Sequence, residues 1–102
     1  MVREILKEIS ELLERHNLSS NLLFSAVNGD EEQLWHYLIS NDLWGGAGSV
    51  ADQALLSFPE ERKKLDILMI RLGHVQMKIG RVNSRTEMWT SVFEKWQAEK
   101  LR

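Results

Sequence analysis

Apolar residues recur along most of this 102-residue chain at spacings of three and four, which is the period of an amphipathic helix. The longest such stretch runs from Pro59 to about Ile79. Pro59 suits the first helical position, because that position needs no backbone N–H. The stripe along this stretch consists of Leu65, Leu68, Leu72, Val75 and Ile79, widened by Met69. We therefore expect one long helix at about 59–79.

This long helix is apolar on more than one side, because Ile67, Ile70 and Met77 fall away from the main stripe. A helix of this kind either lies between neighbouring helices or exposes an apolar patch. We favour a central position in a bundle, and a homodimer seam along the second side is the alternative. Gly73 indicates a close approach by another backbone, and Gly80 is expected to end the helix in the left-handed conformation.

Three further main helices are predicted by the rest of the chain. The first follows a narrow apolar stripe over residues 2–13, and a short helix follows over 22–27. The next begins at Asp30, with Gln33 at the position of a capping box. The last begins near Ser84, and one of its faces carries Met88, Trp89, Val92, Phe93 and Trp96. We expect this aromatic face to pack in the core, although a peptide or cofactor groove is the alternative.

A second short helix is predicted after Ser49, which matches a capping box with Asp52. The chain shows no repeat, no strand-like alternation and no linker. We therefore predict a single all-α domain over residues 1–102. Its architecture is a compact helical bundle of four main helices plus one or two short helices, with the long central helix at about 59–79.

The composition narrows the compartment and the chemistry. The chain has no cysteine, which excludes disulfides, thiol chemistry and zinc sites built on cysteine. No apolar run reaches membrane-spanning length, and the N-terminus lacks the pattern of a signal peptide. We expect a cytoplasmic protein with no membrane partner.

The net charge of −2 conceals two oppositely charged intervals. Residues 16–61 contain seven acids and no lysine or arginine, whereas residues 62–86 contain seven bases and one acid. Such intervals either pair within the fold or present complementary surfaces to partners. The candidates for contact with a basic partner are Asp30, Glu31, Glu32 and Asp42. The candidates for contact with an acidic partner are Arg71, Lys78, Arg81 and Arg85.

A glycine-rich loop at 45–49 is a candidate for small-molecule or anion binding, because backbone N–H groups at a helix start can hold phosphate or carboxylate. The candidate residues are Trp44, Gly45, Gly46, Gly48 and Ser49. A dinucleotide site, however, needs a preceding strand, and here a helix is predicted to precede the loop. We therefore favour a tight connection between helices, with Trp44 closing the core rather than forming a platform for a ligand.

No arrangement of residues indicates catalysis. The three histidines fall on three different predicted helices without the spacing of metal ligands. We expect no catalytic residue, no metal and no cofactor. The basic stretch 71–85 suggests nucleic-acid binding as an alternative, but the acidic overall balance and the lack of a helix-turn-helix pattern argue against it.

The sequence thus leads to one main hypothesis. The protein is a non-enzymatic helical domain that binds a protein partner or itself, as a possible homodimer, through complementary acidic and basic surfaces. Small-molecule or anion binding at 45–49 and nucleic-acid binding at 71–85 remain the alternatives.

Overall fold

The computed structural model of the chain describes residues 1–16, 18, 21–45, 49–53 and 62–98. These residues form helices and connections, with no strand among them. The helices are α1 (Val2–Arg15), α2 (Asn21–Asn28), α3 (Glu31–Leu38), α4 (Asn41–Trp44), α5 (Val50–Gln53), α6 (Arg62–Ile79) and α7 (Thr86–Ala98). The prediction of an all-α bundle is therefore confirmed.

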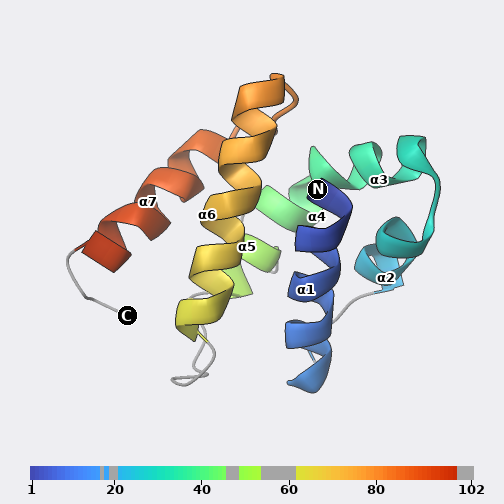
Figure 1. Ribbon diagram of the computed structural model, residues 1–102, viewed down its shortest axis with the longest axis horizontal. Helices are drawn as coiled ribbons and strands as arrows, with labels where there is room; N and C mark the ends of the chain where they lie inside the picture. The colour runs from blue at the N-terminus through green and yellow to red at the C-terminus, as the bar shows by residue number, and fades with distance from the viewer. Residues whose placement is uncertain (17, 19–20, 46–48, 54–61, 99–102) are drawn as a thin grey trace.

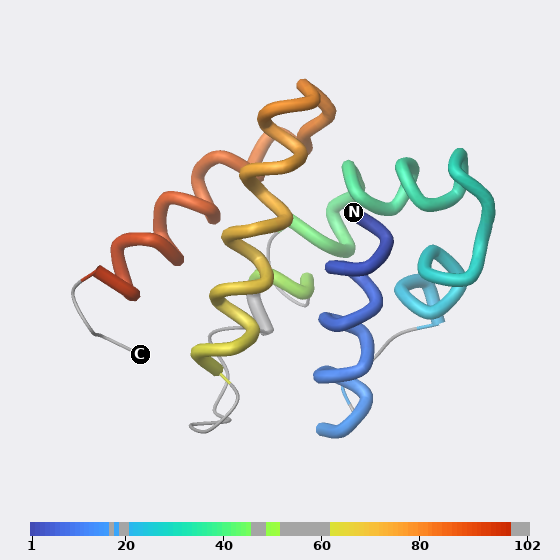
Figure 2. The backbone as a smooth tube through the Cα atoms, viewed as in Figure 1, coloured from blue at the N-terminus to red at the C-terminus, as the bar shows by residue number. Residues whose placement is uncertain are grey.

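The long helix α6 lies in the centre of the bundle, as expected. It packs against α7 on one side and against α1 on the other (Figure 1). The path of the backbone in Figure 2 then leads from α1 to α2 and α3 at the outer edge, and α4 returns towards α6. The expected first residue, Pro59, lies outside the described residues.

The buried face of α6 differs from the predicted stripe. It contains Leu65, Asp66, Met69, Leu72, Gly73 and Gln76. Ile79, which the pattern placed on the core side, is 53% exposed. The helix turns Asp66 and Gln76 into the core, and both polar side chains find partners inside the protein. Asp66 accepts a hydrogen bond from Gln97 Nε2 at 3.2 Å, and Gln76 makes three bonds that are described below.

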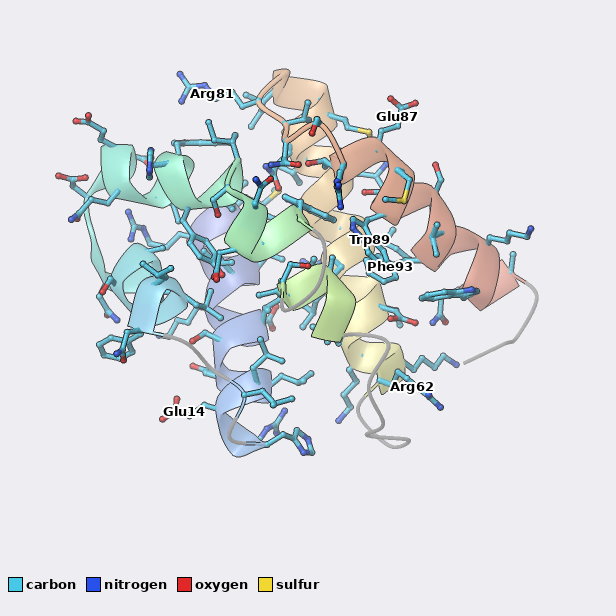
Figure 3. The ribbon with its side chains drawn as sticks, turned by 180° about the vertical axis from the view of Figure 1, so that it is seen from behind. Glu14, Arg62, Arg81, Glu87, Trp89 and Phe93 are labelled. Carbon is cyan, nitrogen blue, oxygen red and sulfur yellow. The ribbon has the colours of Figure 1, made fainter. Side chains whose placement is uncertain are left out.

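The final helix packs on α6 through aromatic and small residues. Figure 3 shows Trp89 and Phe93 on the side of α7 that faces α6, and the two rings stack with centroids 5.6 Å apart. Phe93 is fully buried, but Met88 is 47% exposed, so the predicted face was wrong at that position. Thr90 takes a place in the core instead, next to Gly73. Gly73 therefore marks a close approach as expected, but the atoms that come close belong to the Thr90 side chain rather than to another backbone.

Two helix ends follow their predicted chemistry. The Asp30 carboxylate accepts the backbone N–H of Gln33 at 2.8 Å, and Gln33 Oε1 accepts the backbone N–H of Asp30 at 3.0 Å. This is the predicted capping box at the start of α3. At the end of α6, Gly80 has φ +85°. The backbone N–H groups of Gly80 and Arg81 both donate to the Gln76 carbonyl, at 2.9 and 3.1 Å.

We expect Gly80→Ala to lower the free energy of unfolding by about 1 kcal/mol, because an L side chain is strained at positive φ. No atom lies within 4 Å of the position of the added Cβ, so the cost is conformational rather than steric. Gly80→Asn should cost less, since asparagine tolerates this conformation. Urea unfolding of the two variants measures the difference. Equal losses for alanine and asparagine would contradict this explanation.

Candidate functional site

Trp44, at the start of the glycine-rich loop, belongs to the core. Its side chain is fully buried, and its indole Nε1 donates to Gln76 Oε1 on α6 at 3.0 Å. A buried indole whose N–H is already bonded presents no face to a ligand. The structure thus places Trp44 as a packing residue that joins α4 to α6.

The described ends of the glycine-rich loop bond within the chain. Gly45 is buried, and its carbonyl oxygen accepts hydrogen bonds from Ser49 Oγ at 2.9 Å and from Trp89 Nε1 at 3.3 Å. Ser49 is buried as well. The candidates Gly46 and Gly48 lie outside the described residues. Of the five candidate ligand-binding residues, the three that are described therefore face the interior.

The acidic candidates lie around a hollow between α2 and α3–α4, which we call the acidic hollow. Its volume is about 440 Å³. Three carboxylates line it, from Asp30, Glu32 and Asp42, and its apolar lining includes Leu22, Ala26 and Tyr37. No lysine or arginine lines this hollow in the part of the chain that the structure describes. Glu31 is exposed on the same turn of α3. The lining therefore has one sign of charge.

Two carboxylates of the acidic hollow are held in place, that of Asp30 by the capping box of α3 and that of Asp42 by a tyrosine. The Tyr37 hydroxyl donates to Asp42 Oδ2 at 2.6 Å, and Asp42 itself is half-buried. Glu32, by contrast, is exposed on the surface of α3. The hollow thus combines two fixed acids, Asp30 and Asp42, with Glu32, which can adapt to a bound group.

The basic candidates do not pair with the acidic candidates in the described part of the chain. Arg71 lies 3.8 Å from Glu8 on α1, and both side chains are more than half exposed. Such a pair contributes little to stability. The Arg81 guanidinium lies 5.1 Å from the centre of the Trp35 ring. Neither Lys78 nor Arg85 forms an ion pair with a described residue.

One acidic candidate, Glu32, and one basic candidate, Arg81, line a second depression of about 470 Å³, which we call the end hollow. One wall comes from α3, and the other comes from the connection between α6 and α7. The α3 wall contains Glu32, Trp35, His36 and Ile39, and the wall from the connection contains Gly80, Arg81 and Val82. Figure 3 shows Arg81 at this end of the molecule.

Two amide side chains fasten the walls of the end hollow together. Gln76 Nε2 donates to the carbonyl of Leu38 at 2.8 Å and to that of Arg81 at 3.1 Å. Asn83 Nδ2 donates to the carbonyl of Ile39 at 2.8 Å. Sequence reasoning missed both roles. The available signal was that Gln76 follows Met69 by seven residues and Leu72 by four, so all three share one face of the helix.

The histidines remain apart from one another. His36 lines both hollows, and His74 Nε2 lies 3.2 Å from Glu94 Oε2 on α7. Among the described residues, no three acidic or histidine side chains come together as a metal site would require. The described helices are all too short or too polar to cross a lipid bilayer.

Comparison of the chain with models of known protein families, with curated proteins and with solved structures gave no match. The two hollows and the charges that line them are therefore the features that indicate a function.

Proposed function

We propose that this protein is an interaction domain, and that its acidic hollow binds a lysine- or arginine-containing segment of a partner protein. One observation carries the proposal. Asp30, Glu32 and Asp42 line the hollow together with apolar side chains, and the described lining has no lysine or arginine to neutralise these carboxylates. A cationic side chain would supply that charge.

The hollow matches both parts of a lysine or arginine side chain. The aliphatic stem would lie on Leu22, Ala26 and Tyr37, and the cationic head would reach the carboxylates. The hydrogen bond from Tyr37 already orients the Asp42 carboxylate, so less ordering is needed when a partner binds. Charge complementarity of this kind steers association and selects partners more than it adds affinity. We therefore expect weak binding that falls as salt is added.

A titration with two amphipathic peptides of equal length and opposite charge tests the proposal. The basic peptide should shift the backbone amide resonances of α2 and α3 around the acidic hollow, and the shifts should shrink at high salt. The acidic peptide should leave these resonances unchanged. If the basic peptide also causes no shift there, the proposal fails.

Variants at Ser25 supply a matched pair, because this exposed residue of α2 lines the acidic hollow but not the end hollow. Ser25→Arg should weaken binding of the basic peptide by at least about tenfold, and Ser25→Glu should preserve or strengthen it. Asp42→Asn keeps an acceptor for Tyr37 while removing a charge, so it should weaken binding without unfolding the protein. Equal weakening by Ser25→Arg and Ser25→Glu would point to size rather than charge.

A further inference from the structure

We infer that the end hollow is a docking site for a second copy of this chain, which forms a two-fold symmetric dimer. The proposed function concerns the acidic hollow and a different chain, so this inference adds a second site and names its partner. It rests on the apolar centre of the end hollow and on the opposite charges of its two walls.

The centre of the end hollow is apolar and exposed. Ile39 is 44% exposed and Val82 is 43% exposed. The partly buried Trp35 of α3 lines the same depression. Protein interfaces characteristically have an apolar centre with an aromatic residue, surrounded by charged residues. The end hollow has this composition.

The charges make the surface complementary to itself. Glu32 stands on the α3 wall, and Arg81 stands on the wall formed by the connection. In a two-fold dimer the same patch meets itself in the opposite direction. Glu32 of each copy can then meet Arg81 of the other, so one interface forms two ion pairs.

Both walls are already in place before a second copy binds. Gln76 bonds to the end of α3 and to the Arg81 carbonyl, and Asn83 bonds to the Ile39 carbonyl. In the single chain the Arg81 guanidinium lies over Trp35, and no carboxylate of the described residues forms an ion pair with it. A surface that needs little ordering loses less entropy on association.

We expect a small and reversible interface, in the class that buries less than about 1,200 Å². The dimer should therefore dissociate on dilution and also on addition of salt, which screens the two ion pairs. Sedimentation velocity of the full chain over a range of concentrations, at low and at high salt, measures both effects.

A matched pair of variants locates the interface. Ile39→Lys should raise the dissociation constant of the dimer by at least about tenfold, because it places a charge at the apolar centre. Ile67→Lys is the control. Ile67 is an isoleucine with nearly the same exposure, 43%, but it lines a different depression, between α1 and α6. The control variant should dimerise as the unchanged protein does.

A charge exchange then tests the orientation. Glu32→Arg and Arg81→Glu should each be monomeric alone. In a two-fold dimer of either variant, residues 32 and 81 would carry the same charge at both places where they meet. An equimolar mixture should form a heterodimer, because residue 32 of each chain then faces an opposite charge at residue 81 of the other. Circular dichroism verifies that both variants are folded.

Three results would overturn the inference. The unchanged protein could remain monomeric up to about millimolar concentration, where contacts weaker than about −4 kcal/mol become undetectable. Ile39→Lys and Ile67→Lys could have equal effects, or the mixture could fail to associate. Ser25 lines only the acidic hollow and Ile39 lines only the end hollow, so the peptide titration with the Ser25 variants and the dimer test with Ile39→Lys can fail independently.

Discussion

Replacement of Gln76 by methionine is expected to lower the free energy of unfolding by about 3–5 kcal/mol. Methionine has nearly the same length and volume, so the core should lose hydrogen bonds rather than packing. A domain of this size has a total stability of about 5–15 kcal/mol, so the loss is a large part of the whole.

The magnitude follows from what the Gln76 amide bonds to. Its Oε1 accepts from the Trp44 indole at 3.0 Å, and its Nε2 donates to the carbonyls of Leu38 and Arg81 at 2.8 and 3.1 Å. Gln76 and Trp44 are fully buried. Methionine would leave one donor and two acceptors without their partner, and each buried polar group left unbonded costs about 1–3 kcal/mol.

A double-mutant cycle with Trp44→Phe isolates the central bond. Trp44→Phe removes the indole N–H, so Gln76→Met should cost less in that background than in the unchanged protein. We expect a coupling of at least about 1 kcal/mol from urea unfolding of the four proteins. Strict additivity would show that the amide and the indole do not depend on each other. Gln76→Met should also weaken dimerisation, because Gln76 fastens the walls of the end hollow.

The elements of this fold could be predicted from the sequence because most depend on local rules. The capping box at Asp30, the left-handed Gly80 and the central position of α6 each follow from a short pattern. The rotation of α6 could not be predicted, because a buried glutamine is stable only where distant chain segments supply its partners. Those partners, at Leu38 and Trp44, are more than 30 residues away.

The candidate site was predictable only in part. The order of charged residues along the chain showed one acidic and one basic interval. The structure places Glu32 and Arg81 on facing walls of one depression. The hollows themselves arise from how α3 packs against α2 and against the connection after α6, which no helical period encodes. The exposure of Ile39 and Val82 could not be predicted for the same reason. A single apolar residue near a helix end gives no sign of whether tertiary packing will cover it.

Gly73→Val is expected to lower the free energy of unfolding by about 3 kcal/mol, because α7 packs directly against the Gly73 backbone. A Cβ on residue 73 would overlap the Thr90 hydroxyl and would lie 3.1 Å from Thr90 Cβ. The hydroxyl cannot easily turn away, since it donates to the Thr86 carbonyl at 2.7 Å. Two helices would have to separate, and the core between them would lose contacts.

Gly73→Ala separates this steric cost from the helix preference of the residue. Alanine is favoured over glycine within a helix by about 1 kcal/mol, so the net loss should be only about 1–2 kcal/mol. Thr90→Ala removes Oγ1 and Cγ2, two of the three close atoms including the one that overlaps, and in that background Gly73→Ala should lose most of its cost. Ser91→Ala is the matched control, because Ser91 is exposed on the same turn of α7 and should give no relief. Equal costs of Gly73→Ala in the Thr90→Ala and Ser91→Ala backgrounds would show that Thr90 does not set the distance between α6 and α7.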